Sequence, residues 1–199
     1  MPARRYHLRM VPEGTTERLI LRPLEIADAE QIQEIFPHWE IVQYMLDRIP
    51  WPYPADGALR FLTEVAIPQG ESGVAWQWTI RQRVEPERII GAITLAQGFE
   101  ANRGFWLGLP WQGQGFMTEA ADWANDYWFE TLGHPLLRVA KAIANKASRR
   151  ISEKQGMHIV GFEERDFVAG RLPSEIWELT AVEWLARRAE VCPSSMARV

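Results

Sequence analysis

The segment Pro110–Glu119, PWQGQGFMTE, has the residue types of an anion-binding loop. An apolar stretch, GFWLGL, precedes it and a helical pattern follows it. The first N–H groups of a helix lack backbone partners and carry partial positive charge, and Gly113 and Gly115 would let a phosphate approach the backbone closely. Thr118 could add a hydroxyl donor. The segment predicts a phosphate or pyrophosphate site, although the glycines could also serve a tight turn alone.

Two better-known phosphate motifs do not match this chain. A P-loop requires Gly-Lys-Ser/Thr, which the sequence lacks. A dinucleotide fingerprint requires G-x-G-x-x-G in an early βαβ unit, whereas here only Gly113 and Gly115 match, in mid-chain after a series of strand patterns. The loop therefore fits neither of these two classes of phosphate site.

The elements around the loop predict one α+β domain over residues 1–199, with flexible tails at 1–14 and 190–199. Three strands at Gly73–Arg83, Ile89–Gln97 and Arg103–Leu109 form an antiparallel meander before the loop, and a helix at Phe116–Leu132 follows it. The other predicted elements are a strand at Arg18–Pro23, helices at Asp28–Phe36, His38–Met45 and Ala55–Ile67, a strand at Leu136–Ala144, a helix at Asn145–Gln155, and strands at Met157–Phe167 and from Ile176, the last continuing into a terminal helix.

Composition narrows the classes of partner. A net charge of -4 gives no electrostatic reason to expect nucleic acid. No apolar run approaches the roughly 18–20 residues of a membrane helix, and the N-terminus has no apolar signal core. The single cysteine, Cys192, suits a reducing cytoplasm, and no histidines have metal-site spacing. We expect a cytoplasmic protein with no metal, membrane or nucleic-acid partner, and the oligomeric state cannot be predicted.

A second motif, Asn145-x-x-Ser148 followed by RRISEKQGM, strengthens the cofactor interpretation. Together with Gln112-x-x-Gly115 it resembles the GNAT acetyltransferase superfamily, and most closely the branch of the ribosomal-protein N-terminal acetyltransferases. The similarity also includes TERLILRPLEIADAEQI, IIGAITL and VGFEE, and so covers most of the chain. This resemblance implies a mixed, mostly antiparallel sheet with helices on both faces and a strand–Gly-loop–helix cofactor site.

The resemblance also implies that acetyl-CoA is the co-substrate and assigns residues to it. Trp106 and Leu107 would end a splayed strand whose backbone binds the pantetheine arm and the acetyl carbonyl, while Asn145 would bind the arm and Ser148 would lie near the sulfur. Met117 stands where a small residue is usual, so its side chain must point away from the cofactor. The pyrophosphate would bind at Gln112, Gly113, Gln114, Gly115, Phe116, Met117 and Thr118.

The chemistry requires a neutral amine, a stabilised oxyanion and a proton for the departing thiolate. Many relatives use a tyrosine as the acid, but the segment after Asn145 has none, so Ser148 is the candidate catalytic hydroxyl, or it only hydrogen-bonds the sulfur. Asn102 stands where relatives often carry a glutamate base, which leaves Glu100 as a displaced candidate. Deprotonation through water or by the substrate is equally compatible with the sequence.

The sequence indicates least about the residues that bind the acceptor amine. Trp39 and Trp51 lie in a proline-rich stretch and are candidates for its pocket, although most of the ten tryptophans are expected in the core. The leading hypothesis is an N-acetyltransferase whose acceptor is a peptide or protein N-terminus or a small amine. The alternative is a non-catalytic acyl-CoA-binding module, which the missing tyrosine, Asn102 and Met117 favour.

Overall fold

The computed structural model describes residues 11–98 and 101–191. Its first half places helices between an early strand pair and an antiparallel meander. In chain order the elements are β1 (Gly14–Thr15), β2 (Leu19–Pro23), the 3-10 helix η1 (Ile26–Asp28), α1 (Ala29–Ile35), α2 (Trp39–Val42), a continuous helical stretch of α3 (Gly57–Phe61), the π-helix η2 (Leu62–Ala66) and α4 (Ile67–Glu71), then β3 (Ala75–Gln82), β4 (Glu85–Ala96) and β5 (Arg103–Leu107).

The second half begins at the glycine-rich loop. It consists of the 3-10 helix η3 (Leu109–Trp111), α5 (Phe116–Asp126) continued by the π-helix η4 (Tyr127–Thr131), β6 (Leu136–Ala142), α6 (Lys146–Lys154), β7 (His158–Phe167), β8 (Gly170–Thr180) and α7 (Ala181–Val191). The strand–loop–helix unit predicted from the sequence is therefore β5–η3–α5.

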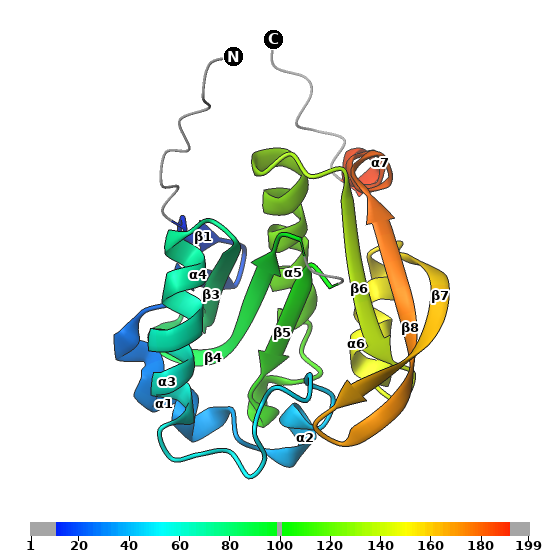
Figure 1. The fold of residues 1–199 in the computed structure, drawn as a ribbon. Coiled ribbons are helices and arrows are strands. Elements are labelled where there is room, and N and C mark those ends of the chain that lie inside the picture. Colours follow the sequence, from blue (N-terminus) through cyan, green and yellow to red (C-terminus); the bar gives the residue numbers. More distant parts are fainter. Residues whose placement is uncertain (1–10, 99–100, 192–199) are drawn as a thin grey trace, which may run out of the picture.

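The strands form two antiparallel sheets rather than the single sheet that the resemblance implied. One has the order β1-β2-β3-β4-β5 and the other β6-β8-β7. β5 and β6 run in the same direction next to each other (Figure 1) and meet at Asn102, whose N–H donates to Arg138 O at 2.7 Å. The Asn102 side-chain Oδ1 accepts from Arg138 N at 2.9 Å, so a side chain takes the place of a backbone carbonyl. Beyond this contact the two strands belong to separate sheets.

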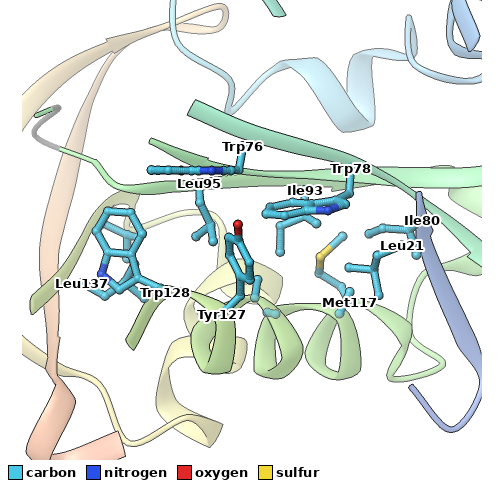
Figure 2. Packing of buried hydrophobic residues seen from close by; sticks show 14 of the residues in the cluster. Leu21, Trp76, Trp78, Ile80, Ile93, Leu95, Met117, Tyr127, Trp128 and Leu137 are labelled. Atoms are coloured by element: carbon cyan, nitrogen blue, oxygen red, sulfur yellow. The ribbon is translucent and has the colours of Figure 1, made fainter. Parts of the chain in front are cut away.

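One face of the first sheet packs on α5 and forms the main core. Alternation along β3 directs Trp76, Trp78 and Ile80 toward this helix (Figure 2), and all three are buried. The Trp78 ring lies 5.1 Å from Trp123 and 5.3 Å from Tyr127, in edge-on contacts that suit aromatic quadrupoles. Trp76, Trp78 and Trp123 thus pack the first sheet against the helix.

The opposite face of the first sheet is covered by the helices that precede β3 (Figure 1). A second cluster of buried apolar side chains fills this layer: Ile32, Phe36, Ile41, Val42, Ala58, Leu62 and Ile89. Trp106 of β5 packs against this cluster, with its ring 5.1 Å from Phe36. Helices therefore cover both faces, and the α+β prediction is confirmed.

The tip of the β7–β8 hairpin reaches back to the segment after α2, near the lower end of β5 (Figure 1). Val168 N donates to Met45 O at 2.9 Å and Ala169 N donates to Gln43 O at 3.1 Å. This contact ties the second sheet to the helices of the first half.

Secondary structure extends into both segments, 1–14 and 190–199, that were expected to be flexible tails. Pro12 O accepts a hydrogen bond from Trp78 Nε1 at 2.7 Å, and Gly14 pairs with Leu21 in β1. At the other end α7 includes Glu190 and Val191. Among residues 11–98 and 101–191, no helix has the length and apolarity needed to span a membrane.

Candidate active site

The glycine-rich loop is held by its own side chains. Gln112 Nε2 donates to Leu107 O at 2.9 Å, and Gln114 Nε2 donates to Pro110 O at 2.8 Å. From the segment before β2, Arg18 Nη1 donates to Gln114 O at 3.1 Å. Both glutamine amides therefore shape the loop, which leaves the backbone to face an anion.

The backbone of the loop has a conformation that requires glycine. Gly113 has φ +74° and Gly115 has φ +83°, in the left-handed region that side chains rarely adopt. Gly115 is the N-cap residue of α5, and residues 112–115 are all exposed. The first N–H groups of an 11-residue helix thus lie at an exposed glycine-rich surface beside the Arg18 guanidinium, which suits a pyrophosphate.

The two residues that begin α5 turn their side chains into the protein. Met117 is only 6% exposed and lies in the core near Leu21 and Ile80 (Figure 2). Phe116 is also buried, and the Arg18 guanidinium lies 4.6 Å above its ring. Met117 therefore leaves the loop surface clear, as an anion at the helix start requires.

Thr118 lies at the rim of a cleft of about 380 Å³ that α7 closes on its far side. Asp122 of α5, together with Glu153 and Lys154 of α6, contributes to the lining. The cleft thus mixes acidic and basic side chains from α5, α6 and α7.

Glu119 anchors α5 to the start of β2. Its carboxylate accepts from Thr16 Oγ1 at 2.5 Å, Arg18 N at 2.8 Å and Arg18 Nε at 2.6 Å. Burial alone would raise the pKa of Glu119, but these hydrogen bonds and the Arg18 charge outweigh it and hold the pKa below its usual 4.5. The carboxylate thus has a structural role, since it fixes the helix that carries the loop.

A Glu119→Gln change is expected to lower the free energy of unfolding by about 1–2 kcal/mol at neutral pH. A lowered pKa in the folded state gives stability above the unfolded pKa that is lost as pH falls. Denaturant unfolding at several pH values should therefore show the difference from wild type shrinking below about pH 4. Glu64→Gln, at an exposed carboxylate 3.6 Å from Arg60, is the control and should change little. Equal stability of Glu119→Gln and wild type at pH 7 would contradict the anchoring role.

Backbone N–H and C=O groups along β5 alternate between facing β4 and facing away from it, and the second set forms the free edge of this strand. Gly108 N donates to Ile90 O at 2.9 Å, so the backbone groups two residues earlier, at Trp106, also face β4. Those of Phe105 and Leu107 therefore point away from β4, toward the side of β6. The sequence-based prediction placed Trp106 and Leu107 together on this edge, but two adjacent residues cannot share it. Phe105 was missed, although the period of two would have identified it.

The start of α6 brings three polar groups together. Asn145 is the N-cap residue, and its Oδ1 accepts from Ser148 N at 3.1 Å. Ser148 Oγ accepts from Lys141 Nζ at 2.7 Å. Lys141 lies in β6 and was not identified from the sequence, although it continues the inward row of Leu137 and Val139.

Two buried cations, Arg103 of β5 and Lys141 of β6, lie close to each other beside the Phe105 ring. Arg103 Nη1 donates to Asn125 Oδ1 at 2.5 Å, and burial lowers the pKa of Arg103 to about 10 despite the opposing charge of Asp122. Burial, and then the charge of Arg103, hold the pKa of Lys141 well below its usual value. The Phe105 ring lies over both cations, 5.3 Å from Lys141 Nζ and 5.8 Å from Arg103 Cζ. An aromatic ring and two buried cations thus lie together next to the start of α6.

Trp39 and Trp51, the residues expected to bind the acceptor, form an exposed aromatic pair. Trp39 and Trp51 are each 41% exposed, and their rings lie 5.6 Å apart near α2. Asn102, at the position of the usual base, is occupied in joining strands, and its Nδ2 also donates to Ala96 O at 3.1 Å. Glu100 lies outside the described residues.

The family model described as "Acetyltransferase (GNAT) domain" matches residues 18–158. The chain belongs to the GNAT acetyltransferase family. As a member it is an acetyl-CoA-dependent N-acyltransferase, and acetyl-CoA is its co-substrate. Comparison with curated protein sequences finds no match.

Solved structures with similar folds include several acetyltransferases. Ribosomal-protein-S5-alanine acetyltransferase from Vibrio fischeri has a TM-score of 0.73 at 17% identity, over 87% of this chain and 98% of that one. Mycobacterium smegmatis RimJ, in complex with CoA-disulfide, has a TM-score of 0.76 at 16% identity, over 91% and 94% of the two chains. The microcin C7 self-immunity acetyltransferase MccE, in complex with acetyl-CoA and AMP, has a TM-score of 0.70 at 16% identity, over 87% and 99%. These similarities confirm the predicted fold of this GNAT chain.

Proposed function

We propose that this GNAT enzyme transfers the acetyl group of acetyl-CoA to a primary amine, on a site formed by the glycine-rich loop, the free edge of β5 and the start of α6. The observation that carries the proposal is the loop itself. Gly113 and Gly115 have positive φ, residues 112–115 are exposed, and Met117 points into the core. Such a loop offers backbone N–H groups to a pyrophosphate, with the Arg18 guanidinium beside them.

The remaining cofactor contacts follow from the free edge of β5. The backbone groups of Phe105 and Leu107 face the pantetheine arm, except that Leu107 O already accepts from Gln112. On the other side, Asn145 Oδ1 is engaged with Ser148 N, which leaves its Nδ2 as the donor to the arm. In this arrangement the sulfur lies near Ser148.

The proposed reaction is direct attack of the amine nitrogen on the thioester carbonyl. The C–N bond forms and the C–S bond breaks, while an N–H group on the free edge of β5 stabilises the charge on the carbonyl oxygen. The amine loses a proton and the departing sulfur gains one. The Asn102 side chain joins two strands, so the amine proton passes to water or to another part of the substrate in this proposal.

Two acceptor classes are compatible with the site. A peptide N-terminus is suggested by the names of the relatives with similar folds, which include a ribosomal-protein acetyltransferase. A small amine is the second class, because the acyl-transfer chemistry requires only a free primary amine. The half-exposed Trp39–Trp51 pair supplies an aromatic surface for either class.

The proposal is tested by incubating the purified chain with acetyl-CoA and a panel of peptides and small amines. Release of free CoA thiol, together with an acetylated amine seen by mass spectrometry, is the expected result. Saturable acetyl-CoA binding with no thiol release on any amine would instead support the non-catalytic module, whose structural support is the occupied Asn102. No binding at millimolar acetyl-CoA would overturn both.

The aromatic pair gives a prediction about the acceptor. Trp51→Ala is expected to raise KM for the best amine by about fivefold, because it removes one aromatic wall worth about 1 kcal/mol. The dissociation constant of acetyl-CoA, measured by calorimetry, should not change. Phe162→Ala is the matched control, since Phe162 is an exposed aromatic residue on β7. An unchanged KM in Trp51→Ala would remove the pair from the acceptor site.

A further inference from the structure

Lys141 is the most unusual titratable residue near the cofactor site. It is 6% exposed, and its row on β6 otherwise faces the apolar core. Burial of an ammonium group costs free energy unless a carboxylate compensates for it. Among the described residues, no carboxylate oxygen lies within 4.0 Å of Lys141 Nζ. The 2.7 Å contact with Ser148 Oγ is therefore the principal polar contact of this amine.

The charged groups around Lys141 are committed to other partners or repel it. Glu175 lies directly opposite it in the register of β8, but that carboxylate accepts from Arg149 Nε at 2.8 Å and from Trp177 Nε1 at 3.1 Å. On β5, Arg103 adds a like charge that is itself balanced by Asp122 of α5. Lys141 is thus placed to gain and lose a proton rather than to hold a fixed charge.

We propose that Lys141 and Ser148 form a proton relay to the cofactor sulfur, in which Lys141 is a positioning residue and proton source that acts through the Ser148 hydroxyl. The inference rests on the proposed function, because Ser148 must lie beside the thioester. A serine hydroxyl alone is a weak acid. A lysine ammonium hydrogen-bonded to it can replace the proton that the hydroxyl donates. Burial, which lowers the pKa of Lys141, makes that ammonium a stronger acid than an exposed one.

The relay balances over one turnover. As the amine nitrogen bonds to the carbonyl carbon and the C–S bond breaks, the thiolate takes the proton of Ser148 Oγ. Ser148 takes a proton from the Lys141 ammonium, which becomes a neutral amine. The acceptor nitrogen releases its proton to water, and neutral Lys141 regains one from water, so no further reactant is consumed.

The test measures kcat against pH, with saturating acetyl-CoA and the best amine of the panel, in wild type and four variants. In wild type, kcat is expected to fall at alkaline pH as Lys141 loses its proton. Lys141→Arg keeps the charge but does not deprotonate in this range, and it should lower kcat by about 10–100-fold and remove the alkaline fall. Ser148→Ala should cause a similar loss, and the double variant should lose little more, because the two residues act as a unit. Arg60→Met, at an exposed basic residue of α3, is the control and should keep the wild-type profile.

A second measurement does not depend on turnover. Because burial lowers the pKa of Lys141 in the folded state, the unfolded chain binds more protons between that pKa and the usual 10.5. The free energy of unfolding of wild type should rise as pH increases toward 10.5, relative to that of Lys141→Met. A parallel pH dependence in the two proteins would show that Lys141 does not titrate in this range, and would overturn the relay.

The remaining outcomes separate the two proposals. If wild type releases thiol but Lys141→Arg keeps both its kcat and its alkaline fall, the relay is overturned and the acetyl transfer stands. If wild type releases no thiol with any amine, the proposed function and the relay both fail.

Discussion

Gly115→Glu is expected to weaken acetyl-CoA binding by about a hundredfold or more, or about 3 kcal/mol. The new carboxylate would stand at the N-cap of α5, where the helix terminus presents its N–H groups and partial positive charge. It would repel a pyrophosphate there and would take its hydrogen-bond donors. Titration calorimetry with acetyl-CoA is the measurement, and wild-type affinity in the variant would place the pyrophosphate elsewhere.

Backbone strain must be separated from this effect. At φ +83° any side chain costs about 1–2 kcal/mol, whatever its charge. Gly133→Glu is the matched control, since Gly133 has φ +71°, open space around it and a place at the far end of the same helical stretch. It should lose similar stability yet keep its affinity for acetyl-CoA. Equal loss of affinity in both variants would attribute the effect to unfolding.

Gly91→Ala is expected to give the largest loss of stability, about 3 kcal/mol or more. Gly91 lies opposite Leu107 where β4 contacts β5, and a Cβ atom there would come within 2.3 Å of Trp106 O and 2.7 Å of Leu107 Cδ2. Because one of these atoms is backbone, β5 must move away from β4. For a chain of this size the melting temperature should fall by about 6–12 °C.

The same displacement should also affect the site. β5 carries the free edge at Phe105 and Leu107 and leads directly into the loop, so acetyl-CoA affinity should fall with stability. Gly104→Ala is the control, because Gly104 lies on β5 itself and a Cβ atom added there would meet nothing within 4 Å. Its stability should stay within about 0.5 kcal/mol of wild type. A wild-type melting temperature for Gly91→Ala would show that β5 yields without cost.

The elements that the sequence predicts correctly are those that depend on patterns among neighbouring residues. Alternation along β3, the helical spacing after the loop and the glycines at 113 and 115 depend on near neighbours in the chain, and the structure has each of these elements where the sequence placed it. The family followed from two short motifs combined. Local pattern also indicated the inward row of β6, although Lys141 within it was overlooked.

Contacts between distant segments could not be predicted in the same way. The junction between the two sheets is the Asn102 side chain meeting Arg138, 36 residues further along the chain. The structural use of Glu119 depends on Thr16 and Arg18, about a hundred residues earlier. Such pairings become visible only when the fold brings the segments together, because nothing in the neighbourhood of either residue specifies its partner.

The glycine-rich loop is held by contacts within the protein, because the side chains of Gln112, Gln114 and Arg18 bind carbonyl groups of the loop and of β5. A loop that is ordered in advance loses little conformational entropy when it binds. Association with the nucleotide should therefore be a single fast step with no preceding rearrangement. Removing one of these hydrogen bonds, as in Gln112→Ala, should make the entropy of acetyl-CoA binding less favourable in calorimetry. The backbone donors of the loop stay the same in this variant.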